Sequence, residues 1–303
     1  MTDLTNYITA ARWEDILTVW YVLIDDAYHL LTQVEGPLRQ RGPTPSFSDS
    51  EVITVSLLID TFFHGHEDLG LAFVRQYHTN LFPHLLEPGQ FNVRRRALGT
   101  VIDKLRRLLT QHWRLIPASD RYRLMDSAPV PVCTYRRATA NQTVSGPEYF
   151  SVMTSKGGKL CGLRLYLTTS CEQVVEDWYL APAAPRDGKV MRELLEDAHD
   201  LTIFADNAFH DPEEQAFLEK TRRIKIYATP RKDAKTPWPA AFRALATRLR
   251  RRVETALSVL TTVFNVEQPH ARSLDGIFGR IATRLLAYNL SFVVGPLLAR
   301  LAP

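Results

Sequence analysis

A change of pattern near residue 118 constrains the fold of this chain more than any other feature. Before it, apolar residues such as Ile16, Val19, Trp20 and Leu23 recur at the three- and four-residue steps of amphipathic helices. After it come short apolar runs typical of strands, at residues 122–125, 163–168, 174–180, 201–205 and 224–228. Helical patterns at 188–199 and 211–220 separate the last three runs. This order predicts an α/β fold that begins with a meander of strands.

We expect two domains in the 303 residues. Residues 1–118 are predicted to form a helical N-terminal domain, and residues 119–303 an α/β domain with further helices at its C-terminal end. Within the first, Ser48 and Glu51 have the spacing of a capping box at a helix start. Residues 91–113 are predicted to form one continuous helix. A long Arg-rich helix is expected over 238–264, and a last helix over 273–298.

Three acidic residues stand at positions that suit a metal site. Asp126 and Asp206 each end a strand-like run, and Glu254 lies in the long Arg-rich helix. Mg²⁺ prefers oxygen ligands, and a pair of such ions can stabilise both the attacking and the leaving oxygen in phosphoryl transfer. The pattern therefore predicts a two-metal phosphoryl-transfer site built from two strands and a helix.

Each of these carboxylates also has a structural interpretation. Asp126, which precedes Ser127 and a proline, could belong to a turn, and Asp206 could cap the segment that follows its strand. Glu254 could pair with Arg250 one helical turn earlier. A fourth acidic residue, Asp187, is better explained as the N-cap of the next helix than as a metal ligand.

Basic residues gather in two runs, Arg94–Arg96 and Arg248–Arg252. Solvated helix faces also carry such runs, but a net charge of +4 and a pI near 9.0 favour a polyanionic partner. We predict contacts to DNA phosphates from residues in these runs, around the first strands and after the last strand: Arg94, Arg95, Arg96, Arg136, Arg137, Lys156, Arg231, Lys232 and Arg250. Arg250 is expected nearest to the catalytic carboxylates.

Several other classes of protein are disfavoured. The three cysteines lack the spacing of a disulfide framework or a cysteine-based zinc site, and no signal peptide is expected at the N-terminus. The most apolar stretch, 285–299, is short for a membrane span and is predicted to be a buried helix. His64, His66, Glu67 and Asp68 look metal-like, but no matching ligand set occurs elsewhere, so a loop is expected.

Longer segments resemble the insertion-sequence transposases of the DDE type, and most specifically the IS982 family. The resemblance rests on FSDSEVITVSLLI in the helical part, MDSAPVPVC around Asp126 and FADNAFHD around Asp206. It also includes YFSVMTSKGGKLCGLRLYLTTS between these two and RRRVETALSVLTTVFN around Glu254. The chain departs from the broader group at Thr247 and Thr261, where a tyrosine and a lysine are common.

The resemblance implies an RNase H-like catalytic domain with a mixed sheet, preceded by a helical domain. It implies that Asp126, Asp206 and Glu254 bind two Mg²⁺ ions, with Mn²⁺ as a substitute. The implied activity is cleavage of double-stranded DNA at the terminal inverted repeats of a mobile element, followed by strand transfer into target DNA. A homodimer on DNA, a cytoplasmic, nucleoid-associated location and no membrane partner are also expected.

Two alternatives remain open at this point. A nuclease on the same fold could cut DNA without joining it. A degenerate copy could bind DNA and no longer cut it, although the retained acidic residues disfavour that alternative.

Overall fold

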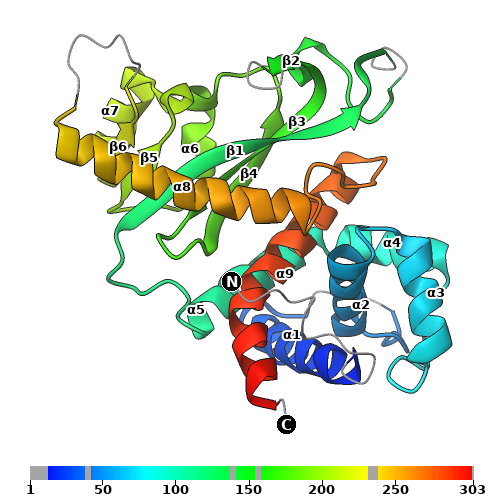
Figure 1. The fold of residues 1–303 in the computed structure, drawn as a ribbon. Coiled ribbons are helices and arrows are strands. Elements are labelled where there is room, and N and C mark those ends of the chain that lie inside the picture. Colours follow the sequence, from blue (N-terminus) through cyan, green and yellow to red (C-terminus); the bar gives the residue numbers. More distant parts are fainter. Residues whose placement is uncertain (1–12, 38–41, 137–140, 154–157, 231–237, 302–303) are drawn as a thin grey trace. The chain divides into compact units, whose positions relative to one another are not determined.

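A computed structural model describes residues 13–37, 42–136, 141–153, 158–230 and 238–301 of the chain. The described residues form two compact units, each with its own core. The first combines residues up to 115 with those from 262 onward, and the second contains residues 116–261 (Figure 1).

The first unit is helical, as predicted. Ser48 caps its second helix, where the Ser48 hydroxyl accepts from the Glu51 amide and the Glu51 carboxylate accepts from the Ser48 amide. This capping box confirms the helix start inferred from the sequence. The helices are α1 (Trp13–Glu35), α2 (Asp49–Phe62), α3 (Glu67–Tyr77), α4 (Pro88–Ala97), α5 (Gly99–His112) and α9 (Leu274–Leu301).

The prediction of one continuous helix over 91–113 is wrong. The helix breaks between α4 and α5 at Leu98, which leaves helical geometry with φ −91° and ψ 2°. Gly99 then lies against α9: a Cβ at Gly99 would come within 3.0 Å of the Gly279 Cα and of the Phe278 ring. The break therefore allows two helices to pack against α9 at a contact too close for a side chain.

The last helix, α9, packs against α5 and α2. A window in Leu274–Leu297 is long and apolar enough to cross a membrane, but 83% of it is buried inside the fold. Leu285, Leu286 and Tyr288 are fully buried. The predicted buried helix is thus confirmed, and it serves as the core of the helical unit.

The two units differ from the two expected domains in where the C-terminal residues belong. We expected the helices after the catalytic segment to accompany it. Instead, residues 262–303 group with residues 1–115, because α9 supplies the apolar surface around which α1, α2, α4 and α5 pack.

The second unit is built on a mixed sheet. Its order is β2-β3-β1-β5-β6, and β4 also pairs with β3. Strands β1–β4 pair antiparallel, while β1, β5 and β6 run parallel. The strands are β1 (Tyr122–Cys133), β2 (Phe150–Met153), β3 (Gly158–Thr169), β4 (Val175–Pro182), β5 (Thr202–Ala205) and β6 (Lys225–Ala228).

All five strands expected from the apolar runs are present, and β2 was not predicted. The helix expected over 188–199 is shorter, a 3-10 turn η5 (Asp187–Val190) followed by α6 (Met191–Leu194). A second 3-10 turn η6 (Asn207–Phe209) leads to α7 (Pro212–Arg222), and the long helix is α8 (Ala240–Thr262). The α/β fold class with an initial meander is confirmed.

Strand β1 is longer than its apolar run because it continues through two prolines. It pairs with β3 along nearly its whole length, but with β5 only over Tyr122–Met125. Pro129 and Pro131 therefore lie where β1 has a neighbour on one side only. A missing amide donor can be accommodated there, as on an edge strand.

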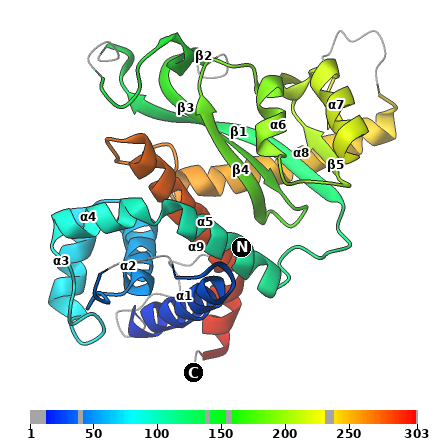
Figure 2. The same cartoon turned by 180° about the vertical axis from the view of Figure 1, so that it is seen from behind.

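Helices cover both faces of the sheet. Met125, Ile203 and Ala205 belong to one core with residues of α6 and α7, including Met191 and Leu218. On the other face, the Phe204 ring lies 6.0 Å from the Phe242 ring of α8. Figures 1 and 2 show α8 crossing one face of the sheet and α6 and α7 lying on the opposite face.

Candidate active site

Asp126 and Asp206 lie side by side where two parallel strands stop pairing: Asp206 directly follows β5, whereas Asp126 lies inside β1, which continues to Cys133. Met125 of β1 pairs with Ala205 of β5, and each is followed directly by its aspartate. Parallel neighbours in a sheet are about 4.8 Å apart. The register thus brings together two residues that are 80 positions apart in the sequence.

Alternation along the strands directs both aspartates toward α8. Asp206 stands two residues after Phe204, whose ring contacts α8, and Asp126 has the same relation to Leu124, the register partner of Phe204. On α8, the Arg250 guanidinium lies 3.6 Å from the Asp206 carboxylate and 3.1 Å from that of Glu254. All three acidic residues therefore lie on the side of the sheet that α8 covers, and the Arg250 guanidinium acts on each of them.

The Asp126 carboxyl has a raised pKa. Burial raises its pKa to about 6, and the neighbouring Asp206 and Glu254 carboxylates act in the same direction. The Ser127 amide, which donates to Asp126 at 2.8 Å, and the Arg250 guanidinium oppose this rise. A cation close to such a carboxyl favours its ionised form and offsets the unfavourable effect of burial on the charge.

The structural interpretations of Asp206 and Glu254 also hold. Asp206 caps η6, since one carboxylate oxygen accepts from the Asn207 amide, while the other faces Arg250. Glu254 forms the ion pair with Arg250 one turn away, and its side chain is half exposed. Val253 beside it is buried, so this part of α8 faces the fold as expected.

The donor set suits a hard divalent cation because it consists of carboxylate oxygens alone. Within the described ranges, no three His, Cys, Asp or Glu side chains are gathered closely enough to hold a metal ion. At this site Arg250 occupies the position between Asp206 and Glu254, and its positive charge takes the place that a cation would fill. The residues fit Mg²⁺ by chemistry, provided that Glu254 turns from Arg250.

A comparison with known families is decisive at this point. The transposase DDE domain family matches residues 117–290, which are more than half of the chain and include all three acidic residues. The chain belongs to this transposase family. Members of the family generally use divalent metal ions.

Other comparisons add similarities of lower degree. No curated protein matches the sequence. Among solved structures, the chain is similar to the "Mos1 transposase paired-end complex with left transposon end", with a TM-score of 0.22, 11% identity and coverage of 78% of this chain and 86% of that one. It is also similar to the "Crystal structure of the Mos1 Strand Transfer Complex", with a TM-score of 0.22, 12% identity and coverage of 93% and 95%.

The interpretation of Asp187 as an N-cap is wrong for this transposase domain. Arg186 precedes η5 without a side-chain cap, and the Asp187 carboxylate instead accepts from the Tyr166 hydroxyl at 2.9 Å. Arg164 lies 3.4 Å from the same carboxylate. Tyr166 pairs in register with Ser127, the residue after Asp126, so this network lies on the sheet face opposite to Asp126. No local pattern in the sequence indicates it.

Two of the three arginines in the first run make contacts inside the helical unit. Arg94 contacts the Asp49 carboxylate and the Phe47 carbonyl oxygen. The side chain of Arg95 is only 2% exposed and pairs with Asp60 and Glu67. Arg95 therefore does not present its guanidinium on an open helix face, whereas Arg96 is exposed.

The remaining predicted DNA contacts belong to residues 116–261 of the chain. Arg136 is exposed beyond the end of β1. Four others, Arg137, Lys156, Arg231 and Lys232, fall outside the described residues. On α8, Arg252 is held by the Cys171 carbonyl oxygen and Glu172, and Arg248 and Arg251 are exposed.

The loop expected over His64–Asp68 is only partly confirmed: His64 and Gly65 form a turn, but Glu67 and Asp68 already belong to α3. Glu67 pairs with Arg280 at 2.9 Å. Glu67 therefore serves an internal ion pair. Trp238 packs edge-on against Phe242 and Tyr227, at the end of the core beneath α8.

Proposed function

We propose that this chain is a DNA transposase of the IS982 type, which cleaves DNA at the ends of an insertion sequence and joins them to target DNA. One observation carries the proposal. Asp126 and Asp206 each follow the last register pair of the neighbouring parallel strands β1 and β5, and Glu254 and Arg250 of α8 face them. The family match over this region supports the same activity.

Asp126, Asp206 and Glu254 would hold the metal ions in this proposal. Two Mg²⁺ ions, when bound, stabilise the attacking and the leaving oxygen of the phosphoryl group. Asp126 and Asp206 stay in place because each accepts a backbone amide of the following residue. Glu254, half exposed on α8, is the carboxylate with most freedom to turn.

Arg250 would have a separate role. Its guanidinium now balances two of the carboxylates, and metal binding would release it from them. A planar guanidinium can then donate two parallel hydrogen bonds to a phosphate. We propose that Arg250 holds the phosphate at the cleaved bond, one helical turn from Glu254.

The architecture supports an RNase H-like domain. An antiparallel β1–β4 meander joins two parallel strands, and the acidic residues lie where the central strand loses its parallel neighbour. The helical unit would bind the terminal inverted repeats in duplex DNA, and two copies of the chain would bring the two ends together. A cytoplasmic, nucleoid-associated location follows from that partner.

Joining distinguishes a transposase from a nuclease. The substrate is a linear DNA that carries the sequences flanking this gene, incubated with full-length protein, Mg²⁺ and a supercoiled plasmid. We expect strand cuts at the element ends and covalent joining of those ends to the plasmid. Cuts without joined products, at any protein concentration, would support the nuclease alternative. Binding without cuts would identify a silent remnant.

A further inference from the structure

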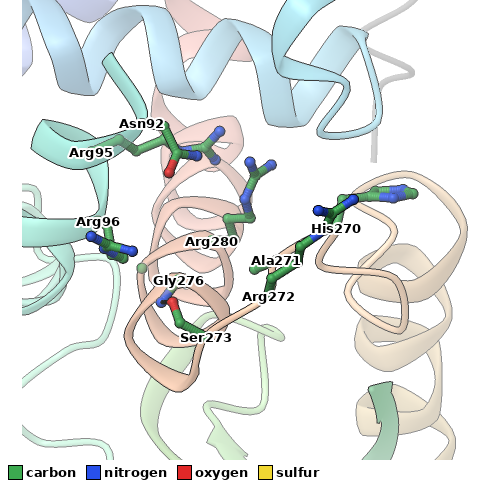
Figure 3. A pocket seen from close by; sticks show the side chains of 10 residues that line it. Asn92, Arg95, Arg96, His270, Ala271, Arg272, Ser273, Gly276 and Arg280 are labelled. Atoms are coloured by element: carbon green, nitrogen blue, oxygen red, sulfur yellow. Dashed lines mark hydrogen bonds between the residues drawn. The ribbon is translucent and has the colours of Figure 1, made fainter. Parts of the chain in front are cut away.

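A cavity of about 270 Å³ lies inside the helical unit, among residues that take no part in the candidate active site. It is bounded by α4, by the segment before α9 and by the first turns of α9 (Figure 3). Among the described residues that line it are four arginines and no acidic residue; the arginines are Arg95, Arg96, Arg272 and Arg280. Such a lining attracts anions.

Two of these arginines are held in place by ion pairs and hydrogen bonds. Arg95 pairs with Asp60 and Glu67, and Arg280 donates to the Gly65 carbonyl oxygen at 2.8 Å and to Glu67 at 2.9 Å. Figure 3 shows the two side chains reaching toward each other from α4 and α9. Their positions are therefore set before any ligand arrives, which lowers the entropic cost of binding.

The carboxylates of Asp60 and Glu67 do not cancel all of the positive charge on the arginines that they contact. Asp60 and Glu67 face three buried arginines, because Arg284 also lies 3.6 Å from Asp60. Burial, and then the nearby Arg95, lowers the pKa of Arg280 to about 10, so this guanidinium is still charged at neutral pH. One positive charge of this cluster is thus left over.

The rim adds donors of two kinds. Arg96 and Arg272 are exposed and line the same space. Ser273 begins α9, where its hydroxyl accepts from the Gly276 amide. The amide groups of a first helical turn carry partial positive charge and favour anions. The backbone end of α9 and the arginines thus act on the same space.

A histidine lies in the same lining. The His270 ring lies against the ring of His66, with 4.8 Å between the ring centroids and an angle of 39° between the ring planes. Burial lowers the pKa of His270, and its neighbours His66, Arg284 and Arg280 lower it further, whereas Asp60 opposes them. The ring is therefore neutral near pH 7, where it offers hydrogen bonding rather than charge.

We propose that this cavity seats a backbone phosphate of the DNA strand that the helical unit binds. This inference rests on the proposed function, which supplies the DNA. A buried pair of guanidinium groups would face the phosphate oxygens, and the exposed Arg96 and Arg272 leave room for the strand to continue on either side. The sequence predicted phosphate contacts from all three arginines of the 94–96 run. The proposed site uses two of them: Arg95 is buried, and Arg96 is exposed.

The test compares variants of the full-length chain in the absence of divalent metal, so that no cleavage interferes. The probe is a fluorescent 30-base-pair duplex that carries the gene's flanking sequence. Arg96→Gln and Arg272→Gln are measured beside Arg75→Gln, a matched control: Arg75 is exposed in the same unit, pairs with Glu87 and lies outside the cavity. Thermal unfolding checks that each variant is folded.

We expect each cavity variant to lower the slope of log K against log salt by about 0.9, the value for one lost phosphate contact. Its loss of affinity relative to wild type should then shrink by about 3.5-fold between 50 and 200 mM salt. The control should keep the wild-type slope. Equal slopes for all four proteins would overturn the inference.

Two further measurements separate the DNA contact from a free-anion site and from the proposed activity. Calorimetric titration with inorganic phosphate tests a free-anion site: binding lost in both cavity variants, with unchanged DNA slopes, would overturn the DNA assignment. Changed slopes in a protein that neither cuts nor joins DNA would uphold the phosphate seat and refute only the proposed activity. Cutting and joining of DNA by the wild-type protein, with unchanged slopes in the cavity variants, would uphold the proposed activity and refute the phosphate site.

Discussion

At the scale of single residues, Asp126 sits where burial and two neighbouring carboxylates oppose its ionisation. The pKa of this carboxyl is about 6 in the fold, above its ordinary value of 3.8. A raised pKa means that the folded state loses stability as pH rises between these two values. In the metal-free protein, ionisation of Asp126 at neutral pH therefore lowers the free energy of unfolding.

Replacement of Asp126 by Asn should therefore stabilise the metal-free protein. At pH 7.5 in a chelator, we expect Asp126→Asn to raise the free energy of unfolding by up to about 3 kcal/mol. Below pH 3.5 the difference should vanish, because the wild-type carboxyl is then protonated. Urea unfolding at both pH values measures this. Added Mg²⁺ should narrow the gap by stabilising wild type alone, and an equally or less stable variant at pH 7.5 would show that burial does not strain this carboxylate.

Arg250 should matter for chemistry more than for affinity. In single-turnover cleavage at saturating DNA, Arg250→Ala should lower the rate by roughly 100-fold, as expected for loss of one charged donor at the reacting phosphate. Arg251→Ala is the matched control, since Arg251 is exposed on the same helix. Its saturated rate should stay within about 2-fold of wild type. Equal rate losses in both variants would assign Arg250 a structural role.

At the scale of elements, the contact of α9 with the α4–α5 junction depends on two glycines that are not equivalent. A Cβ at Gly99 would lie 3.0 Å from backbone and ring atoms of α9, whereas a Cβ at Gly279 would meet nothing closer than 3.6 Å. We expect Gly99→Ala to destabilise the fold by about 1–3 kcal/mol through overpacking. Gly279→Ala should be neutral or stabilising by up to about 1 kcal/mol, because alanine favours a helix interior.

Chemical unfolding of the two alanine variants checks this contrast. Each serves as the control of the other, since both change a glycine at the same helix crossing. Similar midpoints for the two proteins would show that the crossing relaxes freely.

Local signals explain which elements could be predicted. The Ser48–Glu51 capping box and the five apolar runs specify structure through neighbouring residues alone, and both predictions are confirmed. Helix α3 was missed because a loop was expected over His64–Asp68, where the helix begins. Gly70 allows α3 to pack closely on α2, since a Cβ at Gly70 would lie 2.4 Å from an Ile59 side-chain atom. The α4–α5 break likewise depends on α9, far along the chain.

At the scale of the whole chain, the gathering of Asp126, Asp206 and Glu254 could be predicted because the two aspartates each end a strand-like apolar run, although β1 continues beyond Asp126. The burial of Arg95 could not, since a run of arginines looks the same on a solvated face and in an ion-pair cluster. The grouping of α9 with the N-terminal helices could not be predicted either. It depends on which apolar surfaces of the other helices are left for α9 to pack against.

The choice of metal ion follows from an all-oxygen site. Mg²⁺ and Mn²⁺ should both support DNA cleavage. Ca²⁺ should support DNA binding but little cleavage, because its longer and looser coordination misplaces the reacting oxygens. Cleavage assays with each ion after chelator treatment test this. Zinc-dependent cleavage that persists without Mg²⁺ would contradict a carboxylate site.

The most direct test of the three-carboxylate site is Mg²⁺-dependent cleavage of end-bearing DNA by Asp126→Asn, Asp206→Asn and Glu254→Gln, with DNA affinity measured alongside. Glu219→Gln is the control, an exposed carboxylate on α7 in the same unit. We predict that each of the three variants loses at least roughly 1,000-fold in rate, equivalent to about 4 kcal/mol of barrier. Their DNA affinity and the activity of the control should be unchanged. Cleavage near the wild-type rate by any one of the three would contradict its assignment as a metal ligand.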